Sequence, residues 1–184
     1  MAAPKPAPKP APKPAPKPAS IVVISIGELW MRRTVANSWH PAFGIFDTIP
    51  LGTHYALAKT VTEGHDIMNK TVSCMEPPCA ILVLDPGLAQ PGAKSLLDRV
   101  VAYARAGGTV IMTCFFSSHI HMQTMKDFWN KGWGLPWEPG PILRGRFSLN
   151  TDASTLGAAR ELLMRWPIQS YKALSLLNVK REHS

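Results

Sequence analysis

The residues from Ala80 to Cys114 constrain the fold of this chain more than any other feature. CAILVLD (79–85) is an apolar run of strand length that ends in a Pro-Gly pair. TVIMTCFF (109–116) predicts a second buried strand. The intervening residues 93–105 have helical spacing and end at a Gly-Gly pair, with one apolar face formed by Leu96, Leu97, Val100, Val101 and Ala104. This order predicts a right-handed βαβ crossover.

The flanking sequence extends the alternation of strands and helices. IVVISI (21–26) is apolar throughout, which is typical of a strand buried on both faces of a parallel sheet. The remaining predicted elements are helices at 54–67, 122–131 and 155–165, and strands at 146–149 and 173–179. The sequence therefore predicts one α/β domain over residues 21–184, with a three-layer, doubly wound, mostly parallel sheet.

Residues 1–20 have a different character, because Pro-Ala-Pro-Lys repeats fill them. Proline at every second position prevents both helix and sheet and favours polyproline II, so we expect a disordered, extended arm. Its lysines, without any acid, supply half of the formal net charge of +8: Lys5, Lys9, Lys13 and Lys17. The arm is either a solvated spacer or a contact for an acidic or proline-binding partner. Nucleic acid is an unlikely partner because no aromatic residue interleaves the lysines.

Cysteine content and hydropathy indicate the cellular compartment of the protein. Three cysteines are too few for a disulfide scaffold. The amino terminus has no apolar segment of a secretory signal, and no run reaches the eighteen apolar residues of a membrane span. The sequence predicts a cytoplasmic protein that does not enter a membrane.

Two segments carry a family resemblance. AILVLDPGLAQPGAKSLLDRVVAYARAGGTVIMTCFFSS (80–118) resembles the class I glutamine amidotransferase-like superfamily, and FWNKGWGLPWEPGPILRGRFSLN (128–150) is similar to a poorly characterised fungal branch of it. The resemblance covers about residues 79–180, with a looser match at 21–28. It implies a flavodoxin-like fold. It also implies that family members continue past the end of this chain with further strands, so that part of the usual domain is truncated here.

The resemblance also implies a place for a nucleophile. Catalytic members hold a cysteine at a strand-to-helix elbow, and Cys114 lies near that position. One branch places a glutamate after the first strand, which Glu28 matches, and His119 or His121 could act as the base. The neighbours of the cysteine argue against an elbow, because two phenylalanines follow it where a small residue is expected. They favour a buried strand that continues through Cys114.

Three further residues are candidates for binding. Asp85 lies where the sheet edge meets a Pro-Gly loop, either facing a ligand or capping the next helix. Trp133 and Trp137 lie in a Gly/Pro-rich segment that either packs over the sheet or meets a partner. No metal site is expected, because the C-x₄-C pair at 74–79 lacks a second ligand pair, and no cofactor motif occurs.

The leading hypothesis is therefore a non-catalytic or vestigial amidotransferase-like domain that serves as an interaction module. The first alternative is a cysteine-dependent hydrolase or glyoxalase-type enzyme that uses Cys114 with Glu28. The second is a binding protein for acidic partners that uses the basic arm. No substrate is indicated by the sequence.

Overall fold

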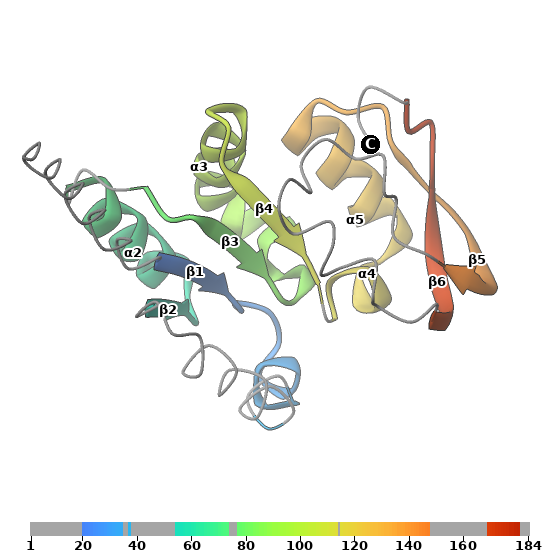
Figure 1. Ribbon diagram of the computed structural model, residues 1–184, viewed down its shortest axis with the longest axis horizontal. Coiled ribbons are helices and arrows are strands. Elements are labelled where there is room, and N and C mark those ends of the chain that lie inside the picture. The colour runs from blue at the N-terminus through green and yellow to red at the C-terminus, as the bar shows by residue number, and fades with distance from the viewer. Residues whose placement is uncertain are drawn as a thin grey trace, which may run out of the picture.

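A four-stranded parallel β-sheet organises the amino-terminal part of the chain (Figure 1). The structure is a computed structural model, which describes residues 20–34, 37, 54–73, 77–113, 115–147 and 169–180. The strands lie in the order β2-β1-β3-β4, and every neighbouring pair is parallel. Their bounds are β1 Ser20–Ile24, β2 His54–Ala58, β3 Ala80–Val83 and β4 Thr109–Met112. The predicted α/β class with a parallel sheet is confirmed.

The main core lies on the face of the sheet that α2 (Val61–Ser73) and α3 (Lys94–Arg105) cover. Alternate strand residues point to this face, so Val22 and Ile24 of β1 lie opposite Ile81 and Val83 of β3. The helical periodicity of α3 buries four of its residues against them, namely Leu96, Leu97, Val100 and Val101. After α3, Gly107 has φ +93°, a conformation that glycine adopts without strain, as expected for the helix end.

A smaller core lies on the opposite face of the sheet. Val23 and Leu84 are fully buried there, and the partly buried residues around them include Leu57, Leu82 and Phe115. On β4 this face opens to solvent, since Ile111 is 46% exposed. The prediction that residues 109–116 form one buried strand is therefore wrong. β4 ends at Met112. It lies at the edge of the described sheet, so it pairs with a neighbouring strand on one side only.

The carboxyl-terminal part holds short helices and a separate two-stranded antiparallel sheet. The helices are α4 (Phe116–His119), α5 (Met122–Asp127) and the π-helical segment η3 (Phe128–Trp133). The strands are β5 (Glu138–Phe147) and β6 (Gln169–Leu177), which stand at the opposite end of the molecule from α2 (Figure 1). An ion pair of 2.7 Å between Lys126 Nζ and Glu138 Oε1 connects α5 to β5.

Several predicted boundaries need correction. The helix predicted at 54–67 is strand β2 followed by α2, because pairing with β1 overrides the helical spacing of the first five residues. The strand predicted at 146–149 is the end of β5, whose start was missed because Pro139 and Pro141 suggest a loop. β6 occupies residues 169–177 rather than 173–179. The predicted helix at 155–165 and the basic arm lie outside the described residues.

Candidate functional site

The carboxyl ends of β1 and β3 form the place in the sheet where strand order reverses. The chain passes from β1 to β2 on one side, then crosses back to β3 and β4 on the other. The loops that leave two such neighbouring strands diverge and open a crevice between them, which is where open α/β sheets bind ligands.

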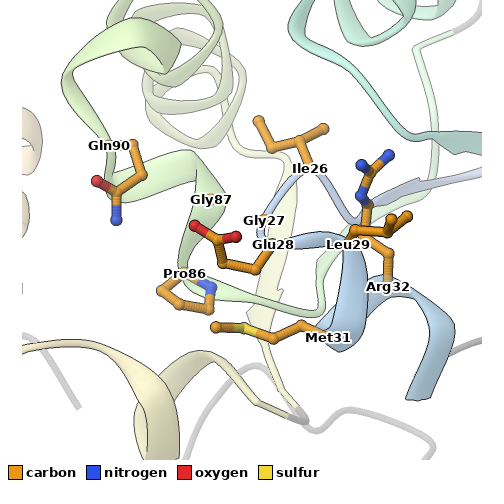
Figure 2. A pocket seen from close by; sticks show the side chains of 9 residues that line it. All are labelled: Ile26, Gly27, Glu28, Leu29, Met31, Arg32, Pro86, Gly87 and Gln90. Atoms are coloured by element: carbon orange, nitrogen blue, oxygen red, sulfur yellow. The ribbon is translucent and has the colours of Figure 1, made fainter.

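A pocket of about 440 Å³ occupies this crevice. Such a volume falls in the usual range for a small-molecule site, roughly 300–1,000 Å³. Its walls come from the segment after β1 and from the loop after β3, in which the 3₁₀ turns η1 (Pro86–Ala89) and η2 (Pro91–Ala93) lead into α3. The lining residues are Ile26, Gly27, Glu28, Leu29, Met31, Arg32, Pro86, Gly87 and Gln90 (Figure 2).

Asp85 connects the two loops that form the pocket walls by hydrogen bonds to both of them. The side chain is 1% exposed, and its Oδ1 accepts hydrogen bonds from the backbone N–H groups of Gly27 and Gly87 at 2.8 and 2.9 Å. Its Oδ2 accepts the hydroxyl of Ser25 at 2.8 Å. The carboxyl group predicted to bind a ligand thus receives three protein donors. Within the described residues, it positions the pocket walls rather than lining the pocket.

The absence of two side chains allows this close approach. A Cβ atom on Gly27 would lie 2.7 Å from Asp85 Oδ1, and one on Gly87 would lie 2.6 Å from the carbonyl carbon of Ile26. Both distances are shorter than real Cβ contacts, so any larger residue would push the loops apart. The two glycines therefore set the shape of the pocket floor.

Three polar side chains give the pocket its chemistry. Figure 2 shows the Glu28 carboxylate on the side of Gly87 and Gln90, with the Arg32 guanidinium directed away from it. Arg32 Nη1 donates to the carbonyl oxygen of Lys59 at 3.1 Å, and its buried Nε–H has no hydrogen-bond partner among the residues that the structure describes. Sequence reasoning missed Arg32 and Gln90. The only signal was that Arg32 stands four residues after Glu28, one helical turn further along.

The predicted nucleophile Cys114 lies outside the described residues, but its chain neighbours are described. Thr113 N–H donates to Val83 O, and Phe115 N–H donates to Leu84 O, both at 2.9 Å. The chain then enters α4 at Phe116. β4 therefore ends at Met112 and α4 begins at Phe116, in place of the continuous strand that the two phenylalanines suggested.

The two predicted bases, His119 and His121, have different surroundings. His119 packs against Phe115 and Trp30, at ring-centroid distances of 5.0 and 5.3 Å, and its Nδ1 lies 2.9 Å from Ser118 Oγ. His121 caps α5, because its Nδ1 accepts the N–H of Gln123 at 3.3 Å. The Trp30 contact brings the segment that carries Glu28 next to α4. No hydrogen bond joins Glu28 to either ring in the part of the chain that the structure describes.

Trp133 and Trp137 lie away from this pocket, in an aromatic cluster on η3 and the residues after it. Trp129 is the centre of the cluster, with ring centroids 6.0 Å from Trp133 and 4.8 Å from Trp137. Both predicted residues are half-buried and pack against the main core. The structure therefore separates these two candidates from Glu28 and Asp85.

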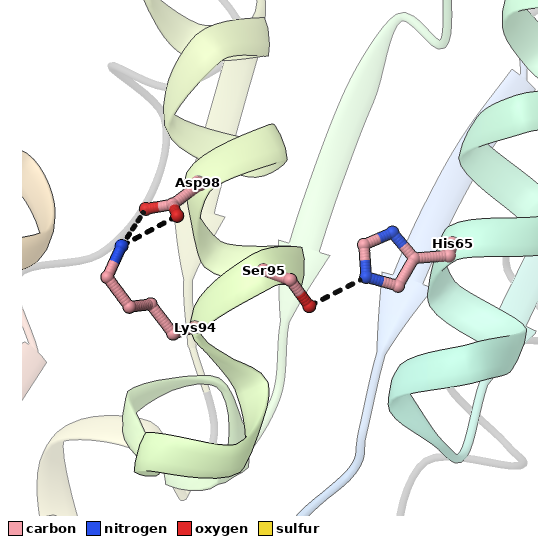
Figure 3. A network of polar contacts seen from close by, with 4 residues as sticks. All are labelled: His65, Lys94, Ser95 and Asp98. Carbon is pink, nitrogen blue, oxygen red and sulfur yellow. Dashed lines mark hydrogen bonds and ion pairs between the residues drawn. The ribbon is translucent and has the colours of Figure 1, made fainter.

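A serine–histidine pair that the sequence did not indicate bridges α2 and α3 (Figure 3). His65 Nε2 lies 3.0 Å from Ser95 Oγ, which resembles a nucleophile and its base. Arg99 Nη1, a permanent donor, faces His65 Nδ1 at 3.3 Å. Nδ1 must therefore accept, which leaves Nε2 protonated and unable to take the serine proton. The contact connects the two helices, and the sequence does not indicate it because its members are 30 positions apart in the chain.

The described residues contain no group of three or more His, Cys, Asp or Glu side chains able to hold a metal ion. None of the helices in these ranges is long and apolar enough to cross a membrane.

A scan against protein-family models finds no match, and a search of curated proteins finds no significant similarity.

Proposed function

We propose that this chain is a ligand-binding α/β domain of the flavodoxin-like class, related to the class I glutamine amidotransferase-like superfamily. In this proposal it binds a small polar molecule in the pocket between β1 and β3 and does not catalyse its conversion. The observation that carries the proposal is the 440 Å³ pocket at the strand-order reversal, with loops held together by Asp85. The order β2-β1-β3-β4 supports the fold assignment, because flavodoxin-like sheets begin with the same order.

The chemistry of the pocket walls indicates the kind of ligand. Glu28 supplies an acceptor, Gln90 supplies both a donor and an acceptor, and Met31 and Pro86 add apolar surface. Such a mixture suits a compact molecule with hydroxyl, amide or amino groups. It is less suited to a phosphate, because the Glu28 carboxylate in the wall would repel an anionic group.

The surroundings of the histidines support binding without catalysis. A nucleophilic cysteine needs an adjacent base or another means of lowering its pKa. Of the histidines whose rings the structure describes, His121 is engaged as a helix cap and His65 is held by Arg99. His119 contacts Ser118 and two aromatic rings, with no hydrogen bond to Glu28.

One observation favours the cysteine-dependent enzyme as the alternative. β4 ends at Met112 and α4 begins at Phe116, so the chain turns from strand to helix between these two residues. A hydrolase or glyoxalase-type enzyme would use Cys114 in that turn, with Glu28 at the same edge of the sheet. The binding hypothesis for acidic partners rests on the basic arm alone and stays a prediction.

Alkylation of the native protein separates binding from catalysis. Iodoacetamide at neutral pH, followed by peptide mass spectrometry, gives a rate for each cysteine, and the exposed Cys79 serves as an internal reference. We expect Cys114 to react no faster than Cys79. A much faster reaction at Cys114, together with turnover that Cys114→Ser abolishes, would replace the binding proposal with the enzyme.

A thermal-shift screen with small amides and polyols tests the pocket itself. Compounds that raise the Tm of the wild type should lose their effect in Glu28→Ala and Gln90→Ala. Gln123→Ala makes the same change at an exposed residue outside the pocket, so it should respond like the wild type. A screen without any stabilising compound, or shifts that survive both pocket variants, would contradict the proposal.

A further inference from the structure

A second cavity of about 480 Å³ lies on the other side of the loop after β3, between α3 and the helical segment α5–η3. It shares Gln90 with the first pocket but takes the rest of its lining from other residues. The loop over residues 86–93 therefore has a cavity on each side, and the proposed function uses only one of them.

The floor of this second cavity is apolar. Leu97 of α3 and Phe128 of η3 form it, and both are almost fully buried, at 7% and 3% exposure. Gly132 lets the two elements come together, because a Cβ atom there would lie 2.8 Å from Leu97 Cδ2. The cavity is thus a groove between two packed helical segments, with a hydrocarbon base that suits a flat apolar group.

Each wall of the groove carries one positive and one negative charge. On α3, Lys94 Nζ lies 2.7 Å from Asp98 Oδ2. On the opposite wall, Lys131 Nζ lies 3.2 Å from Asp127 Oδ2. The hydrogen bond from Lys131 is the main reason that the pKa of Asp127 lies below its ordinary value, so this carboxylate stays charged at neutral pH.

These ion pairs are able to exchange partners. The two lysine side chains are 73% and 78% exposed, and exposed pairs of this kind contribute little to stability. A ligand with one charge would match only half of each wall. A ligand with both an ammonium and a carboxylate group would complement an acid and a base at once.

We propose that this groove is a second binding site, and that it takes a small zwitterion with an aromatic body, the class to which free aromatic amino acids belong. The ring lies over Leu97 and Phe128, the carboxylate meets a lysine of the rim, and the ammonium group meets an aspartate. This site is independent of the proposed function of the first pocket, apart from the shared Gln90.

Calorimetric titration of the whole protein with three compounds tests the proposal. L-Phenylalanine carries both charges, 3-phenylpropanoate lacks the ammonium group, and 2-phenylethylamine lacks the carboxylate. We expect L-phenylalanine to bind, and each of the others to bind about fivefold more weakly or worse, as expected for the loss of one exposed ion pair. No binding of L-phenylalanine, or equal affinity for all three, would overturn the proposal.

A matched pair of lysine variants locates the site. Lys131→Met removes a charge from the rim and should lower the affinity for L-phenylalanine about fivefold. Lys126→Met makes the same change on α5, at a side chain that instead pairs with Glu138, and should leave the affinity unchanged. Equal effects of the two variants, or none from Lys131→Met, would place binding outside the groove. Loss on Glu28→Ala, at a residue that lines the first pocket and not the groove, would assign binding to the first pocket and likewise refute the second site.

Discussion

Replacement of Asp85 by alanine should destabilise the protein strongly, because one buried carboxylate satisfies three donors. Ser25 Oγ–H and the N–H groups of Gly27 and Gly87 would all lose their acceptor. Hydrogen bonds to a charged group contribute about 1.5–3 kcal/mol each, and a buried donor without a partner costs about 1–3 kcal/mol. Removing the carboxylate also removes the cost of burying it, which offsets part of the loss. We therefore expect the free energy of unfolding to fall by about 4 kcal/mol.

Urea unfolding followed by tryptophan fluorescence measures this change. A loss of that size should lower the Tm by about 8–16 °C in a domain of this length, at about 2–4 °C for each kcal/mol. The unfolding slope with denaturant should stay the same, because the surface exposed on unfolding is unchanged.

Asp85→Asn is the control that makes the reasoning refutable. Both backbone N–H groups donate to the same oxygen, Oδ1, so an asparagine can keep these two bonds through its carbonyl oxygen. Its amide nitrogen then faces the Ser25 hydroxyl, which is able to accept. We expect a loss of about 1 kcal/mol or less. An asparagine variant as unstable as the alanine variant would refute the hydrogen-bond account. So would an alanine variant within about 1 kcal/mol of the wild type.

Three further outcomes follow from other parts of the chain. Gly108→Ala should destabilise the protein by about 2 kcal/mol, because its Cβ would overlap the Tyr103 ring. Gly92→Ala, with open space around the new Cβ, should change stability by less than about 0.5 kcal/mol. Urea unfolding of the two variants compares these changes. Burial raises the pKa of Tyr103 above 10.0, so its contribution to stability is complete below pH 10 and is lost as the pH rises through the higher folded value. The difference in absorbance at 295 nm between the wild type and Tyr103→Phe should therefore show a midpoint above 10.0. Deletion of residues 2–18 should leave the Tm unchanged by differential scanning fluorimetry, because β1 begins only at Ser20.

The part of the fold that the sequence predicts is the part where local pattern and burial agree. β1 and β3 are continuous apolar runs in the middle of a sheet, and the apolar stripe of α3 faces them. The sequence predicts a helix in place of β2, because this strand has only five residues and their pattern continues the helical spacing of α2. β5 was placed too late because its prolines suggest a loop. Pairing between distant segments defines both strands, and no local pattern contains it.

The site follows the same division. Glu28 was placed correctly at the sheet edge, because it follows directly after a recognisable strand. The sequence predicts Asp85 either as a ligand-facing residue or as a cap, and the structure shows the cap, since Oδ1 accepts the N–H of Gly87 at the start of η1. Its further bonds to Gly27 and Ser25 join residues 58 and 60 positions apart in the chain, which no local pattern predicts. No local pattern marks Gln90, and the only signal for Arg32 is its place one helical turn after Glu28. They line a pocket only because two loops converge on it.

The link through Asp85 also has a consequence for the speed of ligand binding. A pocket with loops already fastened to each other loses little conformational freedom when it is filled. Encounter should then limit association, and the observed rate in stopped-flow experiments should rise in proportion to ligand concentration, without a plateau. Without the link, each loop would fluctuate separately, and a slow opening step would cap the rate. One buried carboxylate therefore sets how quickly the pocket can respond, as well as its shape.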